Sequence, residues 1–317
     1  MYIFEAEDSN DMAIRVYHAL AEEGVQSGSR NGRVLRFDEP VSMTYYNPES
    51  RCNFTTGRDA NPVFHHMEAL WMLAGRQDVE YLSMFNSNIK NYSDDGEVFN
   101  APYGYRIRRA YGHDQLKEVV KILQADPESR QAVIQLWDHK DLMKDTKDKA
   151  CNMIMVFAIT VDKSVRLTVY NRSNDAVYGG VTGANPVHFS YFLQYVAQEL
   201  SLSIGEMCFV SNNLHIYLDL YDLWEKMDWS SSTQIQGEHL ELGSLEEIEE
   251  FCELAMNQEV IEHTFHSPTL NWLSKPMYNF WIARKQGLST QEDHLEDIRP
   301  ADWAHAVNQW KEKRDGH

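Results

Sequence analysis

Cys151 is the residue in this sequence whose type and neighbours first suggest covalent chemistry. It stands at the start of a run that reads as a β-strand. Lys147 and Lys149 precede it, and positive charge close to a thiol favours the nucleophilic thiolate. A lone cysteine in such a run is more often a small buried hydrophobe. The cysteine by itself therefore leaves both a nucleophile and a core residue open.

A second polar group follows at the end of the next expected strand, in Asn171-Arg172-Ser173-Asn174-Asp175. Segments after strands often present binding and catalytic side chains. Arg172 could hold a phosphate through its fork of donors, with the hydroxyl of Ser173 adding a further bond. The alternative is a turn in which Asn and Asp serve the backbone geometry.

Three further residues have side chains suited to a nucleoside. Asn185 follows the glycine-rich stretch 179–183, and its amide carries the donor and the acceptor that would pair with O4 and N3–H of a uracil ring. Its alternative role is a helix N-cap. His215 and Tyr217 alternate in one expected strand, so they face the same side and could bind a sugar hydroxyl. A buried core histidine is the alternative for His215.

The elements that must position these residues follow from the hydrophobic pattern. Apolar residues at helical spacing predict helices at residues 11–21, 61–73, 114–124, 186–200, 244–256 and 301–310. Runs rich in β-branched residues predict strands at residues 131–137, 152–161 and 165–170. The glycine-containing stretch 24–32 reads as a loop. The chemistry-bearing residues therefore lie at the ends of strands and at the start of one long helix.

Composition limits the class of protein. The 317 residues, 43% apolar and 12% aromatic, supply one large core or at most two domains. The formal net charge of −19 argues against a broad surface for nucleic acid. The four cysteines have neither CxxC pairing nor metal-ligand spacing, so we expect reduced thiols and no metal site.

The sequence also bears on localisation. The first residues do not read as a signal peptide, and no window approaches the roughly 20 consecutive apolar residues that a membrane span requires. We expect a soluble cytoplasmic protein, in a host cytoplasm if a phage encodes it. Neither a membrane nor direct contact with nucleic acid is expected.

The order of the motifs resembles the thymidylate synthase family over roughly residues 11–222. The similar segments are SRNG at 29–32, TTGR at 55–58, EALW at 68–71, APYG at 101–104, DPESR at 126–130, Cys151, RSND at 172–175, the glycine loop with Asn185, and HIY at 215–217. The resemblance implies an α/β (α+β) fold, a large mixed sheet packed by helices and dimerising through that sheet. We expect residues 1–225 to form the catalytic core and residues 226–317 to be a family-atypical, largely helical part of the same domain.

The resemblance also implies a role for each matching residue. Cys151 would be the nucleophile, and a homodimer with shared active sites would bind dUMP or dCMP together with folate. The residues implied to bind the nucleotide phosphate are Arg30, Arg172, Ser173 and, reaching from the neighbouring subunit, Arg130. Those implied to hold the pyrimidine and the 3′-hydroxyl are Asn185, His215 and Tyr217. Those implied to organise proton transfer, water and the folate ring are Glu68, Tyr103 and Asp175.

The implied reaction is one-carbon transfer to C5 of a pyrimidine deoxynucleotide. Addition of the Cys151 thiolate at C6 would make C5 nucleophilic enough to attack the methylene carbon of 5,10-methylenetetrahydrofolate. Glu68 would shuttle protons, directly or through water. Hydride from folate would complete a methyl group and so thymidylate, whereas water would complete a hydroxymethyl group.

Departures from the family pattern bear on the choice between hydride and water. Residues 88–92 lack the tryptophan that the synthases carry, and the chain ends in KRDGH instead of a short apolar tail. The substituted positions are Gly57, Gln131, Ala150 and Asn152. These departures favour a phage-type hydroxymethylase that makes 5-hydroxymethyl-dUMP. A thymidylate synthase and a dCMP hydroxymethylase or methylase are the alternatives within the family.

The preferred base depends on the alignment of the glycine loop. Family members that act on dCMP carry aspartate at the base-reading position, so Asn185 favours dUMP. That alignment needs a two-residue insertion in the loop. A register that aligns Gly183 with this position leaves the base open.

Two readings from other classes compete with a one-carbon transferase. One is a nucleotide-binding homologue that has lost catalysis, against which the retained thiol and arginines argue. The other is a hydrolase built on Cys151 and His215, but nothing like a nucleophile elbow surrounds the cysteine.

Overall fold

The computed structural model describes residues 1–55, 57–227, 235–289 and 291–316. The chain forms two compact units. The first comprises Met1–Ala60, Lys117–Trp137 and Cys151–Gln236, and the second comprises Asn61–Leu116, Asp138–Ala150 and Gly237–His317. Among the described residues, no helix combines the length and the apolar character needed to cross a bilayer.

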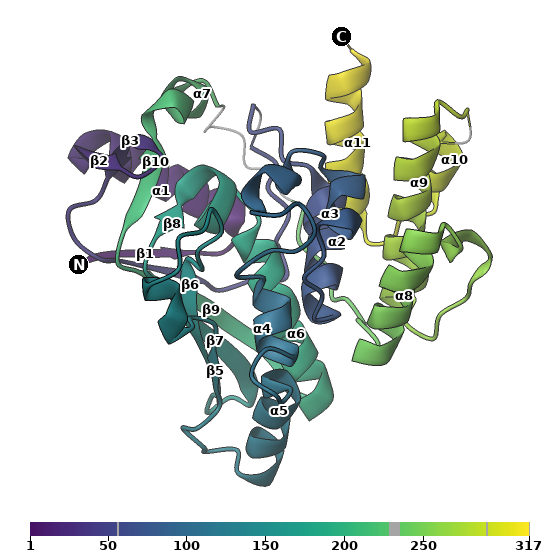
Figure 1. Ribbon diagram of the computed structural model, residues 1–317, viewed down its shortest axis with the longest axis horizontal. Helices are drawn as coiled ribbons and strands as arrows, with labels where there is room; N and C mark the ends of the chain where they lie inside the picture. Colours follow the sequence, from purple (N-terminus) through teal and green to yellow (C-terminus); the bar gives the residue numbers. More distant parts are fainter. Residues whose placement is uncertain (56, 228–234, 290, 317) are drawn as a thin grey trace. The chain divides into compact units, whose positions relative to one another are not determined.

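The first unit contains a six-stranded mixed sheet with the order β1-β4-β9-β7-β6-β5. In that order the strands span Tyr2–Ala6, Val41–Tyr45, Ser203–Ser211, Ser164–Asn171, Asn152–Ile159 and Val133–Gln135. Figure 1 labels β1, β5, β6, β7 and β9 of this sheet. The pairs β1–β4 and β7–β9 are parallel and the other three are antiparallel. The expected α/β fold with a large mixed sheet is confirmed, although β5 is shorter than the strand predicted at 131–137.

Strand β7 shows why this sheet forms. Buried Leu167 and Val169 alternate with exposed Arg166 and Tyr170, which is the period of a strand with one face in a core. Helix α6 (Asn185–Leu200) packs on β7 and β9, and α1 (Ser9–Glu23) packs on β1 and β4. Because α6 is buried over most of its surface, it supplies much of the core of this unit.

The aromatic residues of α6 pack directly on the sheet. The ring of Phe189 lies 5.6 Å from that of Phe209 on β9, nearly edge to face. Burying one phenylalanine contributes about 1.5–3 kcal/mol relative to exposure. Pro186 lies in the first turn of α6, as expected. The first unit also contains α7 (Tyr221–Glu225) and most of α5 (Gln115–Ala125), and the predicted helices at 11–21, 114–124 and 186–200 are confirmed.

A second, four-stranded sheet in the first unit has the order β2-β3-β10-β8. Its strands span Val25–Ser29, Gly32–Arg36, Leu214–Tyr217 and Asn174–Asp175. The prediction of a loop at 24–32 is wrong, because residues 25–29 pair with β3 as a hairpin. The mostly polar strand β2 lacks apolar alternation, so only its backbone pairing identifies it. Gly32, with φ 128°, closes the turn.

Helices dominate the second unit. They are α2 (Pro62–Leu73), α3 (Val79–Phe85), α4 (Tyr103–Arg108), α8 (Leu245–Asn257), α9 (Lys275–Gln286), α10 (Gln291–Glu296) and α11 (Ala301–Asp315). Helix α2 packs against α3, α4, α8, α9 and α11, so it is buried on nearly all sides. The predicted helices at 61–73, 244–256 and 301–310 are confirmed. The expected grouping of residues 226–317 with residues 1–225 in one domain stays a prediction.

Candidate active site

The register of two strands brings Cys151 and Arg172 together. Cys151 directly precedes β6, Arg172 directly follows β7, and the antiparallel pairing joins Asn152 to Asn171. Residues next to a paired position lie opposite each other in an antiparallel sheet. The N–H of Arg172 accordingly donates to the carbonyl oxygen of Cys151 at 2.9 Å, and its Nη2 lies 3.7 Å from Sγ of Cys151.

This arrangement gives the half-buried thiol a cationic neighbour. A guanidinium at hydrogen-bonding distance favours the thiolate over the thiol, because it stabilises the negative charge on sulfur. Cζ of Arg172 also lies 5.7 Å from the centre of the Trp137 ring, a cation–π contact that orients the guanidinium. Trp137 is absent from the residues predicted from sequence, because an isolated aromatic at a strand end belongs to no motif.

Asp175 and His215 are direct neighbours in the four-stranded sheet, as Cα partners of the parallel pair β8–β10. Oδ1 of Asp175 accepts hydrogen bonds from the N–H groups of Val177 at 2.8 Å and Tyr178 at 3.4 Å. Burial raises the pKa of Asp175, although these bonds and the charge of His215 oppose the shift. Burial likewise lowers the pKa of His215, although the negative charge of Asp175 opposes this shift. His215 is therefore a neutral imidazole at pH values near 7.

His215 and Tyr217 lie on the same face of β10, as their spacing predicts. Their ring centroids are 5.2 Å apart and the rings are nearly perpendicular. His215 is buried and Tyr217 is half-buried. The pair therefore offers an imidazole and a phenol side by side, which suits a hydroxyl group that both donates and accepts.

The predicted phosphate ligands lie at different places in the first unit. Half-buried Ser173 is next to Arg172 in the chain. Arg30 is exposed in the turn between β2 and β3, and β3 pairs with the strand that carries His215. Arg130 is exposed in the segment before β5. The structure thus brings Arg172 to Cys151, with Ser173 next in the chain, and it places Arg30 in the turn of the hairpin whose strand β3 pairs with the strand of the predicted sugar-binding pair.

Asn185 is the first residue of α6, and the N-cap is Ala184. The alternative in which Asn185 caps this helix is therefore wrong. Nδ2 of Asn185 donates to Oδ1 of Asn174 at 3.3 Å. Gly183 packs on the backbone of Tyr178 so closely that a Cβ there would lie 2.0 Å from the Tyr178 carbonyl carbon. Because Gly183 has no side chain, Asn185 is the residue of the two that can present a hydrogen-bonding group to a base.

Arg58 supports the loop that carries Tyr178 and Gly183. It is buried, and its Nε donates to the carbonyl oxygen of Val177 at 3.0 Å and to Oγ1 of Thr182 at 3.2 Å. The preceding Gly57 has φ 93°, where the lysine of the family pattern would be strained. The backbone geometry thus accounts for this departure. Thr56 of the same motif lies outside the described residues.

Glu68 and Tyr103 belong to the second unit, on the adjoining helices α2 and α4. Both are half-buried. Gly104 allows the close approach of the two helices, because a Cβ at that position would lie 2.1 Å from the carbonyl oxygen of Met72. The APYG segment therefore owes its glycine to packing, and this packing sets the position of Tyr103 on α4.

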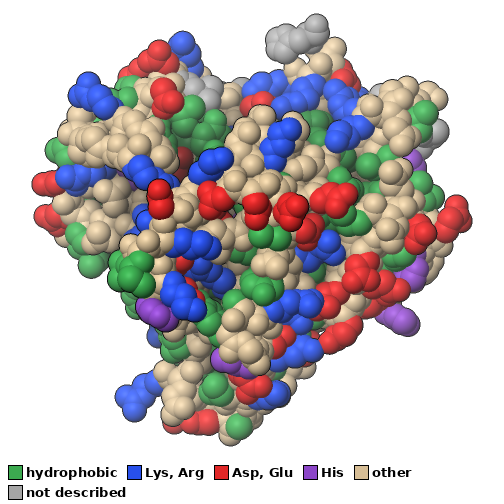
Figure 2. Space-filling model, in the orientation of Figure 1, with side chains coloured by type: hydrophobic (Ala, Val, Ile, Leu, Met, Phe, Trp, Pro, Cys, Tyr) green, Lys and Arg blue, Asp and Glu red, His purple; other side chains and the backbone are tan. Residues whose placement is uncertain are grey.

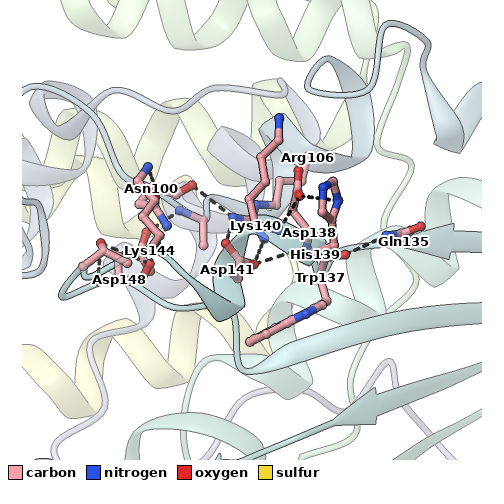
Figure 3. Close-up of polar contacts among 12 residues, drawn as sticks. Asn100, Arg106, Gln135, Trp137, Asp138, His139, Lys140, Asp141, Lys144 and Asp148 are labelled. Carbon is pink, nitrogen blue, oxygen red and sulfur yellow. Dashed lines mark hydrogen bonds and ion pairs between the residues drawn. The ribbon is translucent and has the colours of Figure 1, made fainter.

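The segment 138–150, which leads to Cys151 in sequence, is held within the second unit by the polar contacts in Figure 3. Arg106 donates to both carboxylate oxygens of Asp141, at 2.6 and 2.8 Å. Burial acts to raise the pKa of Asp141, but the hydrogen bonds and charge of Arg106 outweigh it and hold the pKa below its ordinary value. Further along, Oδ2 of Asp148 accepts from the N–H of Ala101 at 2.7 Å.

Comparison with known proteins identifies relatives of this chain. The sequence model of the thymidylate synthase family matches residues 14–272. A deoxyuridylate hydroxymethyltransferase of Pseudomonas phage M6 is 44% identical over 201 residues, which is 63% of this chain and 57% of the relative. A protein of the same name from Bacillus phage SP01 is 35% identical over 266 residues, 80% of this chain and 68% of the relative.

A thymidylate synthase from a cellular organism shares less identity with this chain. The thymidylate synthase of Buchnera aphidicola subsp. Schizaphis graminum is 24% identical over 178 residues, 54% of this chain and 66% of the relative. The family match covers most of the chain, including Cys151, the four-stranded sheet, every strand of the six-stranded sheet except β1, and helix α8. This chain belongs to the thymidylate synthase family.

Proposed function

We propose that this protein transfers a one-carbon group to C5 of dUMP and completes it with water, giving 5-hydroxymethyl-dUMP. The pattern of identity carries the proposal: 44% and 35% to two phage proteins named deoxyuridylate hydroxymethyltransferase, against 24% and 27% to two thymidylate synthases. The chain spans 57% of the length of the first phage relative and 68% of the second.

Cys151 is the proposed nucleophile. Its thiolate adds to C6 of the pyrimidine, and the electron pair of the C5–C6 bond moves towards C5 and O4. Arg172 supports this step, because its Nη2 lies 3.7 Å from Sγ and stabilises the anionic sulfur before attack. Asn185 is proposed to receive the charge that gathers on O4 through a preorganised N–H donor.

The remaining groups of the first unit are proposed to hold the phosphate and the sugar. Arg172 and Ser173 bind the phosphate together with Arg30, because a guanidinium has enough donors to serve a sulfur and a phosphate oxygen at once. His215 binds the 3′-hydroxyl in its neutral form, as its lowered pKa favours. Tyr217, 5.2 Å away between ring centroids, completes this contact.

The proposed cofactor, 5,10-methylenetetrahydrofolate, supplies the one-carbon unit when it binds. The donor set fits it, because Asp175 offers a carboxylate acceptor for the N–H groups of a pterin ring and two backbone amides hold its Oδ1 in place. The ring of Tyr178, 54% exposed, follows in the same loop. Glu68 and Tyr103 are proposed to move protons and to hold water, the tasks that a hydroxymethylase needs in its last step.

A homodimer with shared active sites is proposed to form through the outer face of the six-stranded sheet. Val133, Ile154 and Tyr170 are 46%, 37% and 39% exposed on the adjoining strands β5, β6 and β7, and the strand pairing puts them on one face. Exposed apolar side chains that gather on one face favour an interface. Arg130, before β5, would then reach the phosphate bound to the partner.

Small molecules, and not nucleic acid, are the proposed ligands. On the face drawn in Figure 2, Lys and Arg side chains are interspersed with Asp and Glu side chains. The net charge of −19 adds to this picture, because nucleic acid binding depends on clustered positive charge. Local arginines such as Arg172 suffice for one nucleotide phosphate.

The decisive experiment incubates the protein with 5,10-methylenetetrahydrofolate and either dUMP or dCMP. The proposal expects a product from dUMP whose mass exceeds that of thymidylate by one oxygen, with no rise in dihydrofolate absorbance. The Cys151→Ser variant is the control for chemistry at the proposed nucleophile. A thymidylate mass with stoichiometric dihydrofolate would instead establish the second candidate, a thymidylate synthase, which the family match favours.

A further inference from the structure

Five polar side chains form one continuous line of hydrogen bonds inside the first unit. Nδ2 of Asn185 donates to Oδ1 of Asn174 at 3.3 Å, and Nδ2 of Asn174 donates to Oγ of Ser211 at 3.1 Å. Oγ of Ser211 donates to Oδ1 of Asn171 at 3.1 Å, and Nδ2 of Asn171 donates to Oδ1 of Asn152. The line therefore runs from the proposed base-reading residue to the residue that follows the nucleophile.

Each bond in this line points the same way, with the donor on the side of Asn185. The four members other than Asn185 are almost fully buried: Asn152 and Asn171 are 1% exposed, Asn174 is 2% and Ser211 is 0%. Turning Asn174 around would bring its Nδ2 against Nδ2 of Asn185, and turning Asn171 around would bring its Oδ1 against Oδ1 of Asn152. In a buried site such mismatches are costly, because water cannot replace the lost partner. The line thus holds each amide in one orientation.

Packing confines Asn174 further. A Cβ on Gly180 would lie 2.1 Å from Nδ2 of Asn174, and a Cβ on Gly179 would lie 2.9 Å from its Oδ1. Both glycines therefore make room for this amide. The loop itself is fixed, because the hydroxyl of Tyr45 donates to the carbonyl oxygen of Gly180 at 2.7 Å. Asn174 has one place and one orientation, with Oδ1 towards Asn185.

The orientation of an amide decides which pyrimidine it can read. Uracil presents an acceptor at O4 and a donor at N3, whereas cytosine presents a donor at N4 and an acceptor at N3. An asparagine that turns freely can satisfy either base by exchanging its oxygen and nitrogen. Asn185 cannot turn without placing its own oxygen against Oδ1 of Asn174. Its amide therefore matches one base and opposes the other.

From this geometry we infer that Asn174 is a specificity-determining positioning residue, which selects uracil over cytosine by fixing the amide of Asn185, with Ser211 in turn fixing Asn174. The inference rests on the proposed function for the identity of the preferred base. Asn174 acts through Asn185 and is not itself a base ligand. An asparagine at the base-reading position then discriminates as sharply as a side chain with only one hydrogen-bonding form.

The test measures the preference for dUMP over dCMP in the full chain and in three variants. Asn174→Leu removes both hydrogen bonds of the amide at similar volume. Ser211→Ala leaves Asn174 in place but frees it to turn. Ser190→Ala is the matched control, because Ser190 is a buried serine on the same helix as Asn185, 1% exposed and bonded to the Val187 carbonyl. Binding of each nucleotide is followed by calorimetry, and turnover by release of tritium from C5.

The wild-type chain is expected to prefer dUMP. Asn174→Leu and Ser211→Ala should reduce the ratio of dUMP to dCMP affinity by about tenfold or more, partly through stronger binding of dCMP. Ser190→Ala should leave the ratio unchanged. If Asn174 had a merely structural role, its substitution would weaken the binding of both nucleotides alike and preserve the ratio of dUMP to dCMP affinity. This result in folded variants would overturn the inference.

The outcomes separate this inference from the proposed function. A wild-type preference for dUMP with unchanged ratios in Asn174→Leu and Ser211→Ala overturns the inference alone. Wild-type preference for dCMP, or binding of neither nucleotide, overturns the proposed substrate and the inference with it. If Asn174→Leu does not fold, Ser211→Ala still decides, because it removes only one hydroxyl.

Discussion

Nη2 of Arg172 lies 3.7 Å from Sγ of Cys151. The two residues are far apart in sequence, and the antiparallel register of β6 and β7 brings them together. A cation at this position stabilises the thiolate more than the thiol, so the strand register itself favours an anionic sulfur on Cys151. The reactivity of Cys151 should therefore depend on Arg172.

Arg172→Ala should slow alkylation of Cys151 by iodoacetamide at neutral pH by about tenfold or more, because the thiolate loses its cationic neighbour. Arg172→Lys keeps a positive charge, so its alkylation rate should fall less than that of Arg172→Ala. Mass spectrometry of the Cys151 peptide gives the rate. Arg166→Ala, at an exposed arginine on β7, the strand that precedes Arg172, is the control and should alkylate as the wild-type chain does. Equal rates in all three variants would contradict a role for Arg172 in activating the thiol.

Cys151→Ser should abolish release of tritium from C5 of labelled dUMP, a loss of at least about a thousandfold, since a neutral hydroxyl adds poorly to C6. Binding of dUMP should change little, because the phosphate and sugar contacts remain. Cys208→Ser, at another half-buried cysteine, provides the comparison and should stay active. Substantial tritium release by Cys151→Ser would show that Cys151 is not the nucleophile of the reaction.

Burial lowers the pKa of His215 in the folded chain, so the unfolded chain binds more protons as the pH falls below the ordinary histidine range. Unfolding free energy should consequently decrease from about pH 7.5 to pH 5.5, with this residue contributing up to about 1.4 kcal/mol per pH unit. His215→Asn should make the decrease shallower. Asp175 acts oppositely, because its raised pKa stabilises the fold at low pH and this contribution is lost as the pH rises through that value.

Urea unfolding of the wild-type chain and of His215→Asn at the two pH values measures the difference, in which the common contribution of other groups cancels. His113→Asn, at an exposed histidine, is the matched control for the loss of an imidazole. Parallel curves for the wild-type chain and His215→Asn would show that His215 has an ordinary pKa.

The Arg106–Asp141 pair should be essential to the stability of the second unit. The two side chains are 7% and 3% exposed, so Arg106→Ala leaves a buried carboxylate without its main partner and should cost about 3–5 kcal/mol. The double variant Arg106→Met with Asp141→Leu should recover much of this loss, because no charge stays buried. Urea denaturation provides the free energies. A loss below about 1 kcal/mol in the single variant would mean that water reaches Asp141.

Gly183→Ala should destabilise the chain by about 1–3 kcal/mol and weaken dUMP binding, because its Cβ would collide with the backbone of Tyr178 and displace the loop before Asn185. Gly28→Ala is the comparison, since a Cβ there meets nothing within 4 Å. Thermal unfolding and nucleotide titration of both variants measure the effect. Equal stability of the two variants would show that the loop before Asn185 can rearrange to accommodate the added Cβ.

Elements with a strong local pattern were predictable from sequence. Helices α1, α2 and α6 follow the spacing of their apolar residues, and the proline near the start of α6 fits its first turn. The mostly polar hairpin strand β2 was not predictable from sequence. Its structure depends on backbone pairing with β3, and no side-chain pattern indicates that pairing. The role of Asn185 as a helix N-cap likewise failed, because α6 begins one residue earlier than that alternative requires.

The sequence by itself determined the family and the candidate residues, because Cys151, the RSND segment and the HIY segment are local motifs in a recognisable order. The tertiary structure alone decided which of them meet. Strand register joins Arg172 to Cys151, and a line of buried amides ties Asn185 to Asn174. Such contacts depend on pairing between segments distant in the chain, and hydrogen-bond direction is a property of the folded interior that residue order does not contain.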